Sequence, residues 1–334
     1  MKIFITGVAG FLGSHLADLM IANGHTVAGN DNMIGGYADN VPQGVEFHQV
    51  DCCDLENLTK AMEDSDIVYH PAATAYEGLS VFSPVLVTKN IFEASVTTIT
   101  AAIRNKVKRF VYCSSMARYG HHDKMPYKED FECRPQDPYG IAKKAGEDVL
   151  KNLCETHNME YVIAVPHNIV GPRQKYDDPF RNVMSIMLNR MLQGKQPIIY
   201  GDGEQKRCFS YIDDCLYCLN ALAFQDNVIG EVVNIGPDEE SCTINDLAEM
   251  CANETGLNLD TLYHRDRPQE VKIAVCSSDK ARELLGYKTS TNVRQSVQKT
   301  AEYIRSRGTK KFQYHLPLEI INDITPETWK NKLI

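Results

Sequence analysis

Short runs of strand-forming residues alternate with longer stretches of helical periodicity over the first half of the chain. The strand-like runs occupy residues 2–7, 25–30, 45–51, 66–73, 108–115 and 161–166. This alternation predicts an α/β fold with a doubly wound parallel sheet covered by helices on both faces. In open sheets of this type ligands bind beyond the carboxyl ends of the strands, so the residues that follow each run are the first site candidates.

The alternation loosens after about residue 166, where segments rich in proline and glycine appear at 170–179 and 198–214. A further strand-like run at 231–236 is expected to return to the main sheet. The pattern therefore predicts a first domain of residues 1–167 with 209–237, and a smaller C-terminal α/β domain of residues 168–208 and 238–334. In the tail, Thr325, Pro326 and Glu327 favour a helix start, and Trp329 is expected to pack against the body.

Composition and charge exclude several classes of partner. The chain has 334 residues, of which 43% are hydrophobic, and this is enough apolar material for a sizeable core. Its formal net charge of −9 gives no general attraction to nucleic acid or to anionic membranes. An anionic substrate would need a local group of arginines or lysines.

The N-terminus predicts no leader segment, because glycines begin at position 7 and no long apolar run follows. A cytoplasmic location is therefore expected, in which the eleven cysteines stay reduced. Cys215 and Cys218 form a C-x-x-C pair without a second pair of ligands. A zinc site needs four ligands, so we interpret these cysteines as small helix residues and predict no metal.

A glycine-rich turn follows the first strand and precedes a helix expected to begin near Ser14. Glycines at 7, 10 and 13 allow a tight turn and a close approach of the backbone to a pyrophosphate, which the helix N-terminus then attracts. The next strand is followed by Asp31, 24 residues after Gly7, as the acceptor for the two hydroxyls of an adenosine ribose. The same carboxylate would repel a 2′-phosphate. The pattern predicts a Rossmann-type domain that binds NAD, and tighter binding of NADP would contradict it.

Three further residues suggest redox chemistry on an alcohol. Ser115 ends a strand, and Tyr139 and Lys143 lie four residues apart in a helical stretch, so their side chains share one face. A free tyrosine is a poor base at neutral pH, but a neighbouring ammonium and a cationic nicotinamide both favour the phenolate. Tyr139 is therefore predicted to accept a hydroxyl proton, with Ser115 positioning the sugar oxygen.

The chain resembles the extended short-chain dehydrogenase/reductase family, and specifically its nucleotide-sugar epimerase branch. The resemblance covers most of the chain and rests on motifs in the family's order: 6–13, Asp31-Asn32, Asp51, 70–73, Asn90, 114–120, 139–143, 167–174 and 200–214. It implies a homodimer formed through helices near residues 84–105 and 138–157. It also implies a set of NAD-binding residues: Gly7, Gly10, Phe11, Leu12, Gly13, Asp31, Asn32, Asp51, Cys52, Ala72, Ala73, Asn90, Tyr139 and Lys143.

Family members differ in reaction at the positions just after the catalytic serine, which here are Met116 and Ala117. In the 4,6-dehydratases of this family these two positions are an Asp-Glu pair. In the decarboxylases the second position, that of Ala117, is a glutamate. Neither methionine nor alanine can supply an acid or a base. The resemblance therefore implies a 4-epimerase, in which carbon 4 of the hexose is oxidised with bound NAD and then reduced on its other face.

The resemblance places a UDP-sugar on Asn168, Asn182, Tyr200, Arg207, Arg267, Glu270 and Ala274. Arg207 and Arg267 would bind the diphosphate, Tyr200 would pack on the uracil, and Glu270 would bond a ribose hydroxyl. Ala274 occupies the place where such epimerases limit substituents on carbon 2. Because alanine leaves room for an N-acetyl group, we favour UDP-N-acetylglucosamine.

Several alternatives stay open. UDP-glucose and UDP-glucuronate are other possible substrates, and Arg118 could lie near the sugar and favour an acidic substituent, or could instead face solvent or pair with a helix. An oxidoreductase that releases a keto sugar is a further alternative. A non-catalytic NAD-binding sensor is disfavoured, because binding NAD alone does not require Ser115, Tyr139 and Lys143.

Overall fold

A seven-stranded parallel sheet organises the molecule, and a computed structural model describes all of residues 1–334. Every neighbouring pair in this sheet is parallel. The strand order is β11-β6-β5-β4-β1-β2-β3. The predicted strands therefore all form, with bounds β1 (Lys2–Thr6), β2 (Thr26–Asn30), β3 (Val45–His48), β4 (Ile67–His70), β5 (Arg109–Cys113), β6 (Glu160–Pro166) and β11 (Val232–Ile235).

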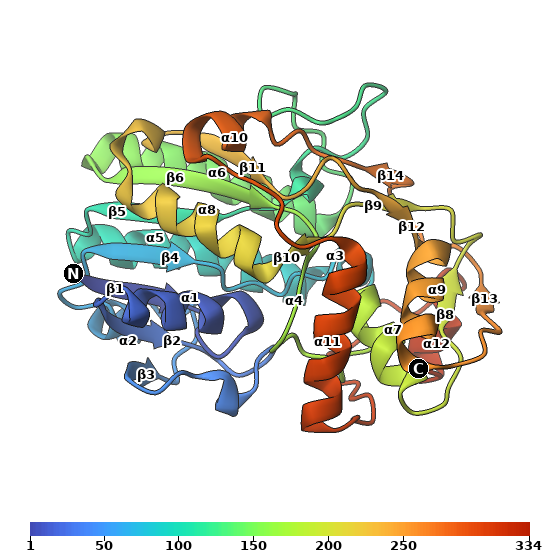
Figure 1. The fold of residues 1–334 in the computed structure, drawn as a ribbon. Coiled ribbons are helices and arrows are strands. Elements are labelled where there is room, and N and C mark those ends of the chain that lie inside the picture. The colour runs from blue at the N-terminus through green and yellow to red at the C-terminus, as the bar shows by residue number, and fades with distance from the viewer.

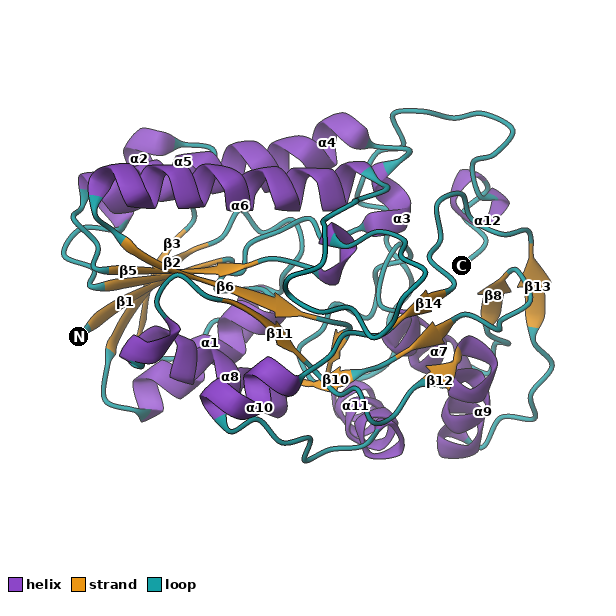
Figure 2. Ribbon diagram, turned by 90° about the horizontal axis from the view of Figure 1, so that it is seen from above, coloured by secondary structure: helices purple, strands orange, loops and turns teal.

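Helices cover both faces of this sheet (Figure 2). The alternation of apolar strands with amphipathic helices requires such an arrangement, because a parallel sheet is apolar on both faces. One face packs against α1 (Phe11–Ala22), α8 (Ile212–Phe224) and α10 (Asp279–Leu285). The other packs against α2 (Leu55–Ala61), α5 (Ala94–Arg104) and α6 (Pro138–His157). The expected Rossmann-type fold is confirmed.

The run at 231–236 returns to the main sheet as expected, because β11 pairs in parallel with β6. Around this return, the remaining segments form a second group with its own apolar core (Figure 1). Its helices are α7 (Val183–Met191), α9 (Ile244–Thr255) and α11 (Val293–Arg307). Its strands are β7 (Ile169–Val170), β8 (Ile198–Tyr200), β9 (Lys206–Arg207), β10 (Ser210–Tyr211), β12 (Cys242–Thr243), β13 (Leu262–His264) and β14 (Ile273–Ala274).

The short elements lie mostly around the carboxyl ends of the strands. They are α3 (Glu77–Ser80), α4 (Pro84–Thr88), the π-helical turn η2 (Lys89–Glu93), and the 3₁₀ turns η1 (Ala38–Asn40), η3 (Met116–Arg118) and η4 (Asp226–Val228). α10 comes from the segment predicted for the second domain but packs on β11 and α8 of the main sheet. The predicted domain boundaries stay a prediction.

The C-terminal tail packs against the body, as expected. The helix α12 (Glu327–Lys330) follows Pro326, and the ring of Trp329 is buried between Phe82 and Phe180, with centroid distances of 6.0 and 5.4 Å. Cys215 and Cys218 belong to α8 and are buried where this helix packs on the sheet, and all eleven cysteines are free. The structure contains no helix long and apolar enough to cross a membrane.

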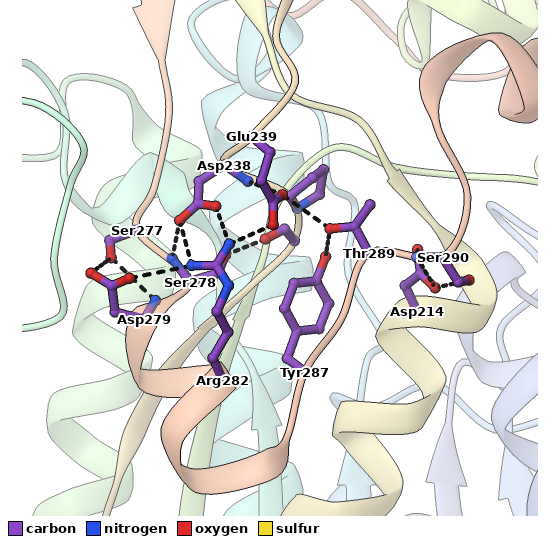
Figure 3. Close-up of polar contacts among 12 residues, drawn as sticks. Asp214, Asp238, Glu239, Ser277, Ser278, Asp279, Arg282, Tyr287, Thr289 and Ser290 are labelled. Atoms are coloured by element: carbon purple, nitrogen blue, oxygen red, sulfur yellow. Dashed lines mark hydrogen bonds and ion pairs between the residues drawn. The ribbon is translucent and has the colours of Figure 1, made fainter.

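A polar network centred on Arg282 fastens α10 to the loop that follows β11 (Figure 3). The Arg282 guanidinium lies 3.1 Å from one carboxylate oxygen of Asp238 and donates at 2.6 Å to Glu239. Asp238 also accepts the backbone N–H of Ser278 at 2.8 Å. Burial alone would raise the pKa of Asp238, but these bonds outweigh it and hold the pKa below its usual value. The network therefore depends on an ionised Asp238.

Replacing Arg282 with methionine should lower the free energy of unfolding by roughly 1–3 kcal/mol at neutral pH, because the three carboxylates of Asp238, Glu239 and Asp279 lose their charged partner. Because the folded-state pKa of Asp238 is depressed, its contribution is present above the unfolded pKa and is lost as pH falls through the folded value, below about pH 4. Urea denaturation at several pH values should show the two proteins converging in acid. The exposed Arg294→Met is the matched control, and an equal difference at every pH would contradict the explanation.

Candidate active site

One large cavity lies beyond the carboxyl ends of the parallel strands, where the main sheet meets the second group. This is the position at which doubly wound folds bind their ligands. The cavity is lined by every residue assigned to the site from the sequence, namely the three expected catalytic residues, the whole expected cofactor set and the whole expected substrate set. Residues as far apart in the sequence as Gly7 and Ala274 therefore line the same cavity.

The glycine-rich turn approaches its neighbours so closely that side chains would not fit. Gly7 has a φ of +65°, and a Cβ atom added to Gly13 would lie 2.2 Å from the Gly7 carbonyl oxygen. The helix α1 begins at Phe11 and not near Ser14 as predicted, because Gly10 already serves as its N-cap. Gly10 offers no side-chain cap, so the first N–H groups of α1 are left to bind an anion.

Asp31 follows β2, and its carboxylate connects this strand end to the glycine-rich turn through a hydrogen bond with Ala9. Its carboxylate is buried and accepts the backbone N–H groups of Ala9 at 3.0 Å and Met33 at 2.7 Å. Burial raises the pKa of Asp31, whereas these hydrogen bonds oppose that rise. The remaining lone pairs of its two oxygens fit the vicinal hydroxyls of a ribose.

Other residues of the expected NAD-binding set follow β2, β3 and β4 or lie in the turn η2. Asn32 donates at 2.9 Å to Asp51, which also accepts the backbone N–H of Cys53 at 2.8 Å. These bonds lower the pKa of Asp51, although burial acts to raise it. Ala72 lies against Gly7, and Asn90 belongs to the π-helical turn η2. Such turns are frequent at functional sites.

Two of the three expected catalytic residues, Tyr139 and Lys143, lie at the start of α6. Asp137 caps this helix by accepting the N–H of Gly140 at 2.9 Å, and Tyr139 and Lys143 follow on one face. A Cβ atom on Gly140 would lie 2.7 Å from the Ala117 carbonyl oxygen, so only glycine allows α6 to approach the turn after Ser115 this closely. Lys143 donates through Nζ to the Cys113 carbonyl oxygen at 2.7 Å. Asp137 lies outside the motifs recognised in the sequence, although an Asp-Pro pair is a helix-start signal.

The far end of the cavity carries the expected substrate residues. Both Arg267 and Arg207 pair with Glu270, at 3.1 and 3.7 Å, and the Arg267 guanidinium lies 4.8 Å above the Tyr200 ring. Asn168 donates to the Cys208 carbonyl oxygen at 2.8 Å, and Asn182 is the N-cap of α7. Tyr200 also hydrogen-bonds Thr328 of the tail. Two guanidinium groups beside an aromatic ring suit a nucleoside diphosphate.

Comparison with known proteins identifies the family. A family model described as the NAD dependent epimerase/dehydratase family matches residues 3–236. The chain belongs to this family. The expected resemblance is thereby confirmed, and NAD is the cofactor of this epimerase-family enzyme.

Solved structures of epimerases are similar to the chain over 92% of its length. UDP-glucose 4-epimerase from Thermotoga maritima with UDP-glucose is 30% identical, with a TM-score of 0.87 and 99% of that chain covered. UDP-N-acetylglucosamine 4-epimerase from Methanobrevibacter ruminantium in complex with UDP-N-acetylmuramic acid is 29% identical, with a TM-score of 0.85 and 99% covered. UDP-glucuronic acid 4-epimerase from Bacillus cereus in complex with UDP-glucuronic acid and NAD is 30% identical, with a TM-score of 0.84 and 100% covered.

The residues of this epimerase-family enzyme fit NAD. The crowded glycines, the uncapped N-terminus of α1 and the Asp31 carboxylate suit its pyrophosphate and its ribose. Burial raises the pKa of Tyr139, an effect that the Ser115 hydroxyl opposes, and burial lowers the pKa of Lys143 to about 8. Bound NAD supplies a hydride acceptor and a positive charge that favours the tyrosinate.

Arg118 does not line the cavity, which overturns the idea that it lies near the sugar. Its side chain is 4% exposed, and one guanidinium nitrogen lies 2.9 Å from a carboxylate oxygen of fully buried Glu147 in α6. The other oxygen of Glu147 accepts the Ser114 hydroxyl. Glu147 lies one helical turn beyond Lys143, so its ion pair with Arg118 and its hydrogen bond with Ser114 connect both sides of Ser115 to the face of α6 that carries Lys143.

Proposed function

We propose that the enzyme is a UDP-sugar 4-epimerase and that its substrate is UDP-N-acetylglucosamine, which it interconverts with UDP-N-acetylgalactosamine. The main support for this reaction is that Ser115, Tyr139 and Lys143 line the same cavity. Met116 and Ala117, which follow Ser115, offer no acid or base for dehydration or decarboxylation. An alcohol oxidation that is later reversed needs only those three side chains.

The three side chains divide the proton chemistry among them. Tyr139 accepts the proton of the carbon 4 hydroxyl, and Ser115 hydrogen-bonds the same oxygen. The Lys143 ammonium stabilises the phenolate and is itself held by the Cys113 carbonyl. After the 4-keto sugar has turned over, Tyr139 returns the proton as the hydride returns to the opposite face. Arg207, Arg267 and Tyr200 hold the nucleotide end meanwhile, because remote binding energy allows the hexose to turn.

Ala274 supports the choice of an N-acetylhexosamine. It lies on β14, where its Cα is paired in register with Arg207, and its side chain lines the cavity. A methyl group at this place leaves space beside the expected sugar position. The proposal therefore includes room for an acetamido group on carbon 2.

A second candidate substrate is UDP-glucuronate, and one observation favours it. Arg181 lines the cavity without a carboxylate partner, and its guanidinium lies 5.3 Å above the ring of Tyr76. An unpaired guanidinium in a sugar pocket suits a carboxylate on the hexose. Arg181, in place of Arg118, is then the arginine that would bind an acidic substituent of the sugar.

The test is to incubate the purified enzyme with UDP-N-acetylglucosamine, UDP-glucose and UDP-glucuronate, each without added cofactor, and to separate the products. Conversion of the first to UDP-N-acetylgalactosamine without net NADH supports the proposal. Preferential conversion of UDP-glucose or UDP-glucuronate would identify that compound as the substrate in place of UDP-N-acetylglucosamine. Accumulation of NADH or a free keto sugar would contradict the epimerase reaction.

The proposed enzyme is a homodimer that associates through the helices from α4 to α5 and through α6. Val85 and Ile141 are exposed apolar side chains on these helices. Their burial by a second copy would remove apolar surface from water. Light scattering of the purified enzyme should give twice the chain mass, and a monomer would contradict this part of the proposal.

A further inference from the structure

Glu77 is a carboxylic acid on the cavity wall for which the epimerase mechanism has no use. It is the first residue of α3, and its carboxylate has no hydrogen bond or ion pair in the structure. The side chain is exposed, but the space it faces is the cavity, so protein surrounds it. This enclosure and the nearby carboxylates of Asp137 and Glu270 together raise the pKa of Glu77 to about 7, against the opposing effect of the Arg207 and Arg267 guanidinium groups.

Two contacts fix where α3 stands. On one side Ser80 hydrogen-bonds Asp137, the cap of the helix that carries Tyr139, at 3.3 Å. On the other side a Cβ atom on Gly78 would lie 3.4 Å from a guanidinium nitrogen of Arg267. Figure 2 shows α3 between the layer of α4, α5 and α6 and the strands of the second group. Glu77 therefore lies between the catalytic tyrosine and the arginines expected to bind the diphosphate, which is the hexose position.

The proposed 4-keto intermediate contains C–H groups that the Glu77 carboxylate could deprotonate. When carbon 4 of the hexose is a ketone, the hydrogens on carbons 3 and 5 become acidic, because the electron pair left behind is delocalised onto the carbonyl oxygen. A carboxylate is an effective base for such a hydrogen when its pKa is close to the working pH. Ser115 and Tyr139, which face the carbon 4 oxygen in the proposed mechanism, would then donate hydrogen bonds to the enolate.

We propose that Glu77 is a second acid–base residue of this site, which exchanges the hydrogen on carbon 3 or carbon 5 of the 4-keto sugar with solvent. The C–H bond breaks, its electron pair forms the enolate, and the proton moves to the Glu77 carboxylate. Return of a proton re-forms the C–H bond and the ketone, so no oxidant or reductant is consumed. Return on the opposite face would give the epimer at that carbon. This proposal rests on the proposed 4-epimerase function, because the ketone must form first.

The experiment is epimerisation in D₂O, with the UDP-sugar that the wild-type enzyme converts, followed by mass spectrometry and NMR of the products. We expect deuterium at carbon 3 or carbon 5 and none at carbon 4, because the carbon 4 hydrogen travels as a hydride that does not exchange with solvent. The deuterium incorporated per epimerisation turnover should rise with pH around the pKa of about 7, because the base must be ionised.

The variant Glu77→Gln keeps the size of the side chain but cannot accept the proton. It should lower deuterium incorporation per turnover by roughly tenfold or more, whereas Glu63→Gln, an exposed glutamate outside the cavity, should leave that ratio unchanged. Wild-type epimerisation without any deuterium at carbons 3 and 5, or equal incorporation in Glu77→Gln, would overturn this proposal alone. A wild-type enzyme that epimerises no UDP-sugar would instead overturn the proposed function.

Discussion

Tyr139→Phe should lower kcat for epimerisation by roughly 10³-fold while the protein still binds NAD. The phenol oxygen is the group proposed to accept the carbon 4 proton, and phenylalanine keeps the ring that packs against Val87 and Ala142. Because the substrate end of the cavity is untouched, KM should change far less than kcat. Steady-state assays give both constants, and absorbance or fluorescence of the purified protein gives the bound cofactor.

A matched control is Tyr119→Phe. This tyrosine is buried like Tyr139, but its hydroxyl donates a hydrogen bond to Asn234 at 2.7 Å and it does not line the cavity. Loss of that hydrogen bond should affect stability more than turnover. If Tyr139→Phe kept more than about a tenth of the wild-type kcat, the proton would leave by another route and the assigned base would be wrong.

Ala274→Tyr should separate the candidate substrates. A phenol at this position would fill the space proposed for the acetamido group, so kcat/KM for UDP-N-acetylglucosamine should fall by roughly 10²-fold. UDP-glucose has only a hydroxyl on carbon 2, and its conversion should change much less. The measurement is the ratio of the two kcat/KM values in the variant and the wild type.

Ala274→Ser is the control, because it changes the polarity at this position with little change in volume. It should preserve the wild-type order of the two substrates. If Ala274→Tyr left conversion of UDP-N-acetylglucosamine unchanged, carbon 2 would not face β14, and the substrate choice would lose its support.

The parallel sheet and the identity of the cavity residues were predictable because each depends on a local signal. The strands are short runs with defined ends, and the glycines around Gly7 together with Asp31 carry their chemistry in their spacing. Helix α1 begins at Phe11, three residues before the predicted start near Ser14, because a glycine N-cap leaves no side-chain signal.

Features that depend on distant partners were not predictable. The orientation of Arg118 is set by Glu147, which is 29 residues away on another helix, and no periodicity near Arg118 indicates that pair. Glu77 belongs to no motif, and its importance appears only when α3 is seen beside Asp137 and Arg267. The position of α10 on the main sheet likewise requires β11 to be in place first.

The return of the chain through β11 has a consequence for any attempt to cut or recombine this enzyme. A fragment that ended at residue 167 would lack β11, so β6 would become an open edge with unpaired backbone groups. It would also lack α8 and α10, leaving apolar sheet surface exposed to water. Such a fragment should aggregate. Chimeras with relatives must therefore exchange the interleaved segments together.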